Sequence, residues 1–370
     1  MIPLFKVAMN PEAEKAVANV LNSGFIGQGS VNEAFETKLK ERYKNNNLVT
    51  VNSGTSALQL ALRLVKDKHP DKKYIITTPL TCTATNWAIL AAGFEIIWAD
   101  IDENDLNINI VDVYMNKLRT DVAAVMVVHW GGYPVDLNKL KRLQEHFKFE
   151  IIEDCAHAFG SFYDNTMIGN SGNYCAFSFQ AIKHLTTGDG GMLILPNEEE
   201  YKKAKLLRWY GIDREDKNKT DFRCENDIKD WGYKFHMNDI SSAIGLANLD
   251  IVDENLKKTW LNAIALRNGL KNVEGVTLLR YNQKNHCSYW IFSLLVDDKE
   301  KFNLKMKEAG IMVSQVHERN DKHTCVAKYE TILPNLNRVV KQLTAIPCGW
   351  WLTEKEVNYI IDKVKNYMND

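Results

Sequence analysis

The stretch FSFQAIKHLTTGDGG, residues 177–191, carries the most information about the fold. Its apolar start predicts the end of a strand that delivers Ser178, and a short loop then presents Lys183 before a glycine-rich turn and another strand. A lysine is usually a solvated surface charge, but phenylalanines and glycines flank this one. Because apolar surroundings lower the pKa of an amine, Lys183 is a candidate nucleophile and proton carrier.

Short apolar runs alternate with amphipathic helical segments on both sides of this stretch. The runs cover residues 48–51, 74–78, 95–99, 122–128, 149–153, 174–179 and 192–195. Parallel strands need crossover connections, which are usually helices. The alternation therefore predicts an α/β fold with a mostly parallel seven-stranded sheet flanked by helices. Ligands of such sheets bind at the carboxyl ends of the strands.

The pattern changes near residue 250. A helical stretch at 253–270, a strand at 289–296, an amphipathic segment at 301–310 and a terminal helix at 353–367 predict a smaller α+β unit. We therefore expect a large domain at residues 1–250 and a small C-terminal domain at 251–370. A length of 370 residues agrees with two domains.

The composition restricts the kind of partner. With 46 basic and 47 acidic residues the formal net charge is −1, which argues against nucleic acid and membrane partners and favours a small molecule. The seven cysteines show no C-x-x-C spacing, so no metal site is expected. The N-terminus does not resemble a signal peptide and no apolar stretch reaches about 18 residues, which predicts a cytoplasmic protein.

The segment NSGTSALQLAL, residues 52–62, follows a predicted strand and opens a predicted helix. Ser56 and Gln59 have the spacing of a capping box. Gly54 would let the backbone approach an anion, and the first N–H groups of the helix favour a phosphate. Taken alone, the segment favours a well-capped helix over an anion site.

The segment IIEDCAH, residues 151–157, ends an apolar strand in a carboxylate. Asp154 could pair with a protonated pyridine nitrogen of a bound cofactor, and it could equally be a turn or capping residue. His157 could reach a ring oxygen of the same cofactor. Without further context, a buried core histidine is the simpler interpretation.

Together with three further motifs, these segments resemble the DegT/DnrJ/StrS family of sugar aminotransferases, which are fold-type I enzymes dependent on pyridoxal 5'-phosphate (PLP). SGFIGQG at residues 23–29 matches the family pattern S-G-x-[IL]-x-x-G. VHWGGYPVD at 128–136 resembles V-H-x-x-G-x-x-x-D, and GYKFHMNDI at 232–240 resembles G-Y-N-[YF]-R-M-x-D-I. The resemblance covers almost the whole chain, with the motifs in the order of the family.

The resemblance implies roles for the residues already singled out. Lys183 would form the Schiff base with PLP and act as general acid and base, and Asp154 would be the partner of the pyridine nitrogen. His157 stands where the family usually has a glutamine beside the ring oxygen. The phosphate would be held by Gly54, Thr55 and Ser178.

Two positions depart from the family. Cys82 stands where the family often has an aromatic residue stacked on the cofactor, so Trp87 either substitutes for that residue or belongs to the core. Lys234 aligns with an asparagine that reaches the phosphate from the neighbouring subunit, and a lysine there is either a charge-assisted contact or a solvated side chain. The resemblance thus implies a homodimer with shared active sites.

The segment SQVHERNDKH, residues 314–323, is unusually polar. In the family the matching region lies near the mouth of the active site and varies with the substrate. His317, Arg319 and His323 are therefore candidate substrate-binding residues for sugar hydroxyls or a phosphate. An exposed loop is an equal alternative.

The implied reaction moves an amino group from an amino acid, typically glutamate, to a keto group of a sugar. The run at residues 186–191 looks closer to enzymes that act at C-4 of a nucleotide-linked 4-keto-6-deoxy sugar; a smaller phosphorylated or carbohydrate carbonyl substrate is the alternative. A sugar dehydratase of the same family would carry histidine in place of Lys183, and His184 is one residue too late. The intact set of Lys183, Asp154 and Ser178 argues against a non-catalytic regulator.

Overall fold

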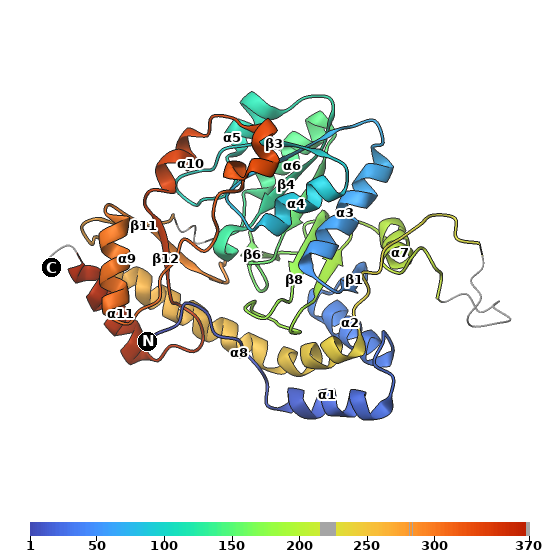
Figure 1. Cartoon of the computed structure of the whole chain (residues 1–370), viewed down its shortest axis with the longest axis horizontal. Helices are drawn as coiled ribbons and strands as arrows, with labels where there is room; N and C mark the ends of the chain where they lie inside the picture. The colour runs from blue at the N-terminus through green and yellow to red at the C-terminus, as the bar shows by residue number, and fades with distance from the viewer. Residues whose placement is uncertain (215–226, 281, 283, 368–370) are drawn as a thin grey trace.

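A seven-stranded sheet forms the centre of the molecule in the computed structural model, which describes residues 1–214, 227–280, 282 and 284–367 (Figure 1). The strand order is β1 (Leu48–Val51), β9 (Gly191–Ile194), β8 (Tyr174–Ser178), β5 (Glu150–Asp154), β4 (Val122–Val128), β2 (Tyr74–Thr77) and β3 (Glu95–Trp98). β9 runs antiparallel to both of its neighbours, and the other six strands share one direction. The predicted sheet is confirmed, with each strand end within one residue of its predicted run.

Helices cover both faces of this sheet. Successive side chains of β4 alternate between the faces, so Met126 packs in one apolar cluster while Val125 and Val127 pack in another. The cluster around Met126 also holds side chains of α3 (Gly54–Lys68) and α4 (Thr83–Ala91). The opposite face is covered by α6 (Leu137–Phe147) and, near β8 and β9, by α2 (Ser30–Tyr43). Burial on both faces explains why the strands are almost wholly apolar.

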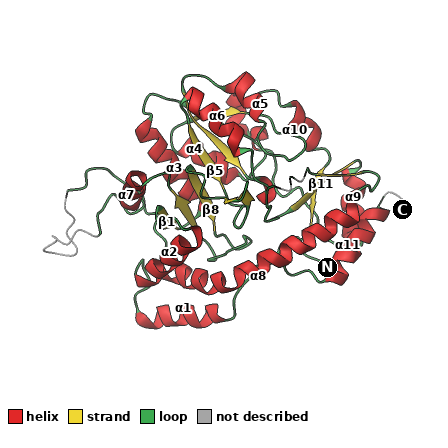
Figure 2. Ribbon diagram, turned by 180° about the vertical axis from the view of Figure 1, so that it is seen from behind, coloured by secondary structure: helices red, strands yellow, loops and turns green. Residues whose placement is uncertain are grey.

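The long helix α8 (Asp239–Leu270) connects the two ends of the molecule (Figures 1 and 2). One end packs against α1 (Glu12–Ser23) and α2, and the other against α11 (Glu354–Asn366). Residue 250 lies within this helix, so the division of the chain at that point stays a prediction.

The C-terminal part forms a smaller α+β unit. Its antiparallel sheet has the order β10 (Val276–Leu278), β11 (Phe292–Val296) and β12 (Leu343–Ile346), and α9 (Lys299–Glu308) and α11 pack with it. The predicted strand at 289–296 begins three residues late, since Tyr289 has a left-handed backbone with φ of 51°. Ile2 bridges to Ile311, so the N-terminus also joins this unit.

The remaining described elements are short or peripheral: α5 (Ile110–Asp112), α7 (Glu198–Leu207), α10 (Pro334–Val339), the π-helical turn η1 (Val113–Lys117), the 3₁₀ turns η2 (Trp130–Gly132), η3 (Asn320–Lys322) and η4 (Thr324–Tyr329), and the strand pair β6 (Phe162–Tyr163) and β7 (Thr166–Met167). Among the residues that the structure describes, no helix has the length and apolar character needed to span a bilayer.

Candidate active site

The predicted site residues gather at one edge of the large sheet. β1, β5 and β8 share a direction, so their carboxyl ends lie at the same edge. Asp154 is the last residue of β5, Ser178 is the last of β8, and Gly54 follows β1. The loop between β8 and β9 returns to this edge with Lys183. A ligand at this edge would meet side chains from segments far apart in the sequence.

The N-terminus of α3 lies directly against the end of β8. A Cβ atom at Gly54 would come within 2.8 Å of the Cβ and 3.1 Å of the Cα of Ser178, so glycine is required for this contact. Gly54 and Thr55 are the first two residues of α3, where N–H groups have no acceptor within the helix. With the Ser178 hydroxyl they form a cradle whose donors suit a phosphate.

The cap of this helix differs from the prediction. Ser53 is the N-cap, and its hydroxyl accepts a hydrogen bond of 3.0 Å from the N–H of Ser56. The predicted capping box of Ser56 and Gln59 is therefore wrong, because Ser56 lies within the first turn rather than before it. The correction places Gly54 and Thr55 at the helix terminus itself.

Asp154 is buried and held by two hydrogen bonds. Oδ2 accepts from the Thr85 hydroxyl at 2.7 Å, and Oδ1 accepts from the N–H of Ala156 at 3.0 Å. Burial raises the pKa of Asp154 above its ordinary value, and the two hydrogen bonds and the nearby Lys183 act in the opposite direction. Fixed in this way, the carboxylate can stabilise a cationic group at the edge of the sheet.

The Lys183 amine lies 3.5 Å from the ring centroid of Trp290. Burial lowers the pKa of Lys183 to about 8, although Asp154 and Cys82 favour the charged form. At neutral pH most of this amine is still protonated, but the unprotonated fraction is far larger than for a solvated lysine. This is what a nucleophile and proton carrier needs, and it agrees with the prediction from the flanking sequence.

Two histidines stack beside this amine. The ring centroids of His157 and Trp290 lie 3.8 Å apart. The His317 ring is nearly parallel to the His157 ring, with 5.7 Å between their centroids. Burial lowers the pKa of His157 well below its usual range and that of His317 to about 4, so both are neutral near pH 7. The N–H of Gly131 points to Nδ1 of His157 at 3.3 Å, which leaves the proton on Nε2. His157 can thus donate a hydrogen bond, as its predicted role requires.

His317 offers a buried polar atom to a ligand. No described residue forms a hydrogen bond with its Nε2. A buried polar atom without a partner is costly, so a bound group that pairs with it gains affinity. Of the three predicted substrate-binding residues, the structure brings His317 closest to the proposed chemistry.

Arg319 does not lie free in this region. Its guanidinium is buried and forms a two-pronged ion pair with Asp321 at 2.7 and 2.6 Å, and it also donates to Asn337 at 2.5 Å. These bonds hold the loop together and occupy the guanidinium of Arg319. His323 packs edge-to-face on Trp87 at 5.7 Å, which places it over the segment that contains Cys82.

Lys234 lies beside the cradle through its backbone. Its carbonyl accepts a hydrogen bond of 3.1 Å from the side chain of Asn52, which precedes the cap of α3. The lysine side chain is exposed. A role for it across a subunit interface stays a prediction.

A buried hydrogen-bonded pair of side chains, His129 and Glu153, supports the edge of the sheet behind Asp154. Nε2 of His129 lies 2.9 Å from Glu153, whose other oxygen accepts from Ser171 and Asn173. Nδ1 of His129 accepts from the N–H of Val135, so the ring donates its Nε2 proton to Glu153. His129, Glu153 and Cys155 lie close enough together to hold a metal ion, but the first two are already bonded within the chain.

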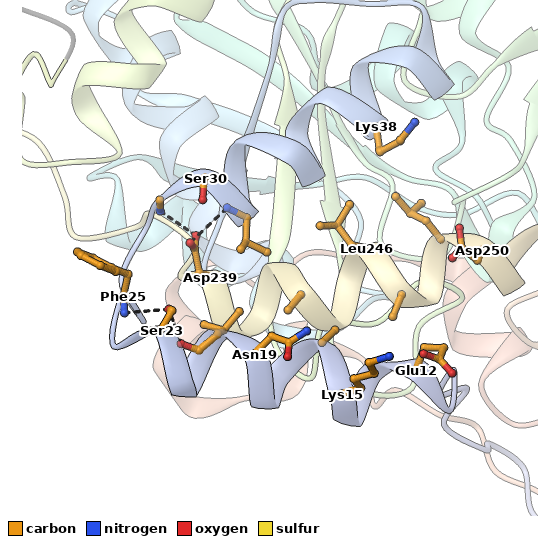
Figure 3. A pocket seen from close by; sticks show the side chains of 17 residues that line it. Glu12, Lys15, Asn19, Ser23, Phe25, Ser30, Lys38, Asp239, Leu246 and Asp250 are labelled. Atoms are coloured by element: carbon orange, nitrogen blue, oxygen red, sulfur yellow. Dashed lines mark hydrogen bonds between the residues drawn. The ribbon is translucent and has the colours of Figure 1, made fainter.

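A cavity of about 850 Å³ lies elsewhere, between α1, α2 and α8 (Figure 3). None of the predicted site residues lines it. Asp239, at one end of the cavity, accepts hydrogen bonds from the N–H groups of Gly29 at 2.7 Å and Val31 at 3.3 Å (Figure 3). Two of the sequence motifs thus meet here, and their residues fasten α2 to α8.

Two residues of the site were not singled out in the sequence. Thr85 lies within the segment 78–87, but nothing in the sequence shows which of its threonines faces Asp154. Trp290 lies within a predicted strand, where an aromatic residue suggests core packing. Only the contact between two distant parts of the chain reveals either role.

Comparison with known proteins identifies the family of the chain. Residues 7–365 match the model of the DegT/DnrJ/EryC1/StrS aminotransferase family.

The chain belongs to this family.

As a family member it is an aminotransferase, and its fold matches solved structures closely. AtS13 from Actinomadura melliaura is 44% identical with a TM-score of 0.95, over 99% of this chain and 98% of that one. The sugar aminotransferase CalS13 from Micromonospora echinospora is 39% identical with a TM-score of 0.95, over 99% of this chain and all of that one. A UDP-4-amino-4,6-dideoxy-N-acetyl-beta-L-altrosamine transaminase of Helicobacter pylori is 31% identical, over 84% of this chain and 81% of its own length.

Proposed function

We propose that this aminotransferase is PLP-dependent and moves an amino group from an amino acid, most simply L-glutamate, to a keto group of a nucleotide-linked 4-keto-6-deoxy sugar. The proposal rests on one observation: the Lys183 amine, the Asp154 carboxylate and the cradle of Gly54 and Ser178 lie together at one edge of the large sheet. CalS13 is named a sugar aminotransferase, and the Helicobacter pylori relative is named for a UDP-linked amino sugar; both names support the class of acceptor.

The residues of the site fit PLP, on which this family depends. Helix N–H groups at Gly54 and Thr55 would hold the phosphate, and Asp154 would pair with the pyridine nitrogen. When bound, PLP supplies an electron sink that makes a proton on the substrate carbon acidic. Nζ of Lys183 would carry that proton, because its lowered pKa lets it accept and release a proton near neutral pH.

The surrounding residues would orient the reactants. His157 is neutral and carries its proton on Nε2, so it can donate to an oxygen without adding charge. His317 has an unpaired Nε2 that suits a sugar hydroxyl, and His323 lies at the neighbouring loop. Lys234 would contact the phosphate of a second subunit in a homodimer.

A smaller phosphorylated or carbohydrate carbonyl compound is the second candidate acceptor, since the cradle and histidines would suit it too. A dehydratase is less well supported. Its reaction would need a histidine in the lysine position, and the residue that contacts Trp290 from the loop is Lys183.

The test combines a chemical and an enzymatic measurement. Borohydride treatment of the protein with PLP should leave the cofactor covalently attached to Lys183 in peptide mass spectra. A Lys183→Ala variant should lose the adduct, and Lys205→Ala, a change in α7, should keep it. The protein should also form 2-oxoglutarate from glutamate and aminate members of a keto-sugar panel. An adduct at another lysine, or deoxygenated sugar without added nitrogen, would contradict the proposal.

A further inference from the structure

Trp290 contacts the lysine loop at two points. Its indole N–H donates a hydrogen bond of 2.9 Å to the carbonyl of Ile182, directly before the lysine. Its ring also lies 3.5 Å from the Lys183 amine, measured to the centroid. One side chain therefore contacts both the backbone carbonyl directly before Lys183 and the reactive end of Lys183 itself.

The ring itself is held firmly in place. It is only 6% exposed and stacks with Phe5 at 5.0 Å and with His157 at 3.8 Å. The preceding residue, Tyr289, has a φ of 51°, a conformation that is strained for an aromatic residue. Such strain persists only where the surrounding structure enforces it, and it is concentrated at functional sites.

The backbone before His317 shows the same feature. Val316 has a φ of 71°, and the N–H of His317 bonds to the carbonyl of Gln315 at 2.9 Å in a tight three-residue turn. A β-branched residue rarely adopts this conformation. Two strained residues thus aim Trp290 and His317 at the same place, the vicinity of the Lys183 amine.

Several titratable groups surround this amine. Asp154 and Cys82 favour its charged form. The nearby histidines are neutral near pH 7, since burial lowers the pKa of His184 to about 3, that of His317 to about 4 and that of His157 well below its usual range. They therefore add no positive charge that would compete with the ammonium for the ring.

We propose that Trp290 is a positioning residue for Lys183, a cation–π dock that receives the lysine as an ammonium whenever its nitrogen is not bonded to another group. An ammonium over an indole face is attracted by the negative face of the ring, and the attraction strengthens where water is excluded. The dock keeps the protonated lysine at the reaction site instead of releasing it to solvent. This inference rests on the proposed function, in which Lys183 alternately carries and gives up a proton.

The test measures the lysine directly, without donor or acceptor substrate. Full-length protein freed of PLP is acetylated with acetic anhydride across a pH series, and modification of Lys183 is quantified by mass spectrometry against the exposed Lys44. The variants are Trp290→Phe and Trp290→Leu. Trp350→Leu is the matched control, because that ring also faces a lysine, Lys6 at 5.6 Å, but outside the site.

Phenylalanine attracts a cation less strongly than tryptophan does, and leucine has no aromatic ring, so both variants should stabilise the Lys183 ammonium less. The pKa of Lys183 should fall by about 1 in Trp290→Leu and by about half as much in Trp290→Phe. It should stay at its original value in Trp350→Leu. If Trp290→Leu does not fold, Trp290→Phe decides alone, since phenylalanine keeps most of the ring volume.

An unchanged or higher pKa in Trp290→Phe would overturn the inference, because water entry without a cation–π contribution moves the value upward. The outcome does not depend on transamination. A lowered pKa in a protein that transfers no amino group would leave the dock standing and reject the proposed function. Normal transamination with an unchanged pKa would reject the dock alone.

Discussion

Substitution of Gly54 by alanine tests the cradle most directly. The added Cβ would lie 2.8 Å from the Cβ of Ser178 and 3.1 Å from its Cα. The second atom belongs to the backbone of β8, where Ser178 pairs with Gly191 of β9. Since neither strand can move without breaking this pairing, the N-terminus of α3 must move instead.

The expected cost follows from these distances. Overpacking of this kind costs about 1–3 kcal/mol. Alanine regains up to about 1 kcal/mol through its higher helix propensity. The free energy of unfolding should therefore fall by about 0–3 kcal/mol. Displacement of the helix terminus should also weaken at least one hydrogen bond to the phosphate, worth about 1.5–3 kcal/mol, which corresponds to about 10–100-fold weaker PLP binding.

Two measurements check this expectation. Urea unfolding of the cofactor-free protein, followed by circular dichroism, gives the loss of stability. An absorbance titration gives the affinity for PLP. Gly27→Ala is the matched control, because a Cβ there would have no neighbour within 4 Å and the backbone has no positive φ. If Gly54→Ala unfolded and bound PLP as the wild type does, the assignment of the cradle would be wrong.

Three further predictions concern the surroundings of the site. Thr85→Val removes a hydrogen bond to the Asp154 carboxylate and should raise the pKa of that acid further. The variant should lose about 1.5–3 kcal/mol in the free energy of unfolding by urea at pH 8, and this loss should shrink at lower pH, where Asp154 is protonated. Thr85→Ser should restore the stability. Arg319→Ala leaves the buried carboxylate of Asp321 without its partner and should lower the free energy of unfolding by about 3–5 kcal/mol. If the variant kept its full stability but lost sugar binding, Arg319 would instead be a substrate-binding residue. Mixing Lys183→Ala with Lys234→Ala subunits should regenerate active sites by exchange, and inactive, verified mixed dimers would argue against shared sites.

The sequence was sufficient to predict the sheet because its strands are buried on both faces. Runs such as VAAVMVV in β4 have no polar residue that could face water, and helical segments separate them. The parallel order then places Asp154 and Ser178 at one edge, since both end their strands. The strand order therefore determines which residues are neighbours at the edge of the sheet, and for this reason the location of the site could be predicted.

Contacts between distant loops could not be predicted in this way. Arg319 was a candidate ligand for the substrate, but its carboxylate partner two residues later competes for the same guanidinium. A polar segment looks the same whether its charges pair with each other or with a ligand. The role of Trp290 depends on a left-handed residue before it, which no periodic pattern reveals.

The antiparallel strand β9 of the large sheet has a consequence for the synthesis of the protein. β1 lies at an edge of the sheet and pairs with β9. Leu48 therefore cannot pair with Ile194 until β9 has been synthesised and has left the ribosome. The contact between Gly54 and Ser178 likewise cannot form until β8 has been synthesised. A nascent chain that stops just before Ser178 already contains the other parallel strands but no complete cradle. The cradle proposed for the cofactor is therefore completed only after the other parallel strands have been synthesised.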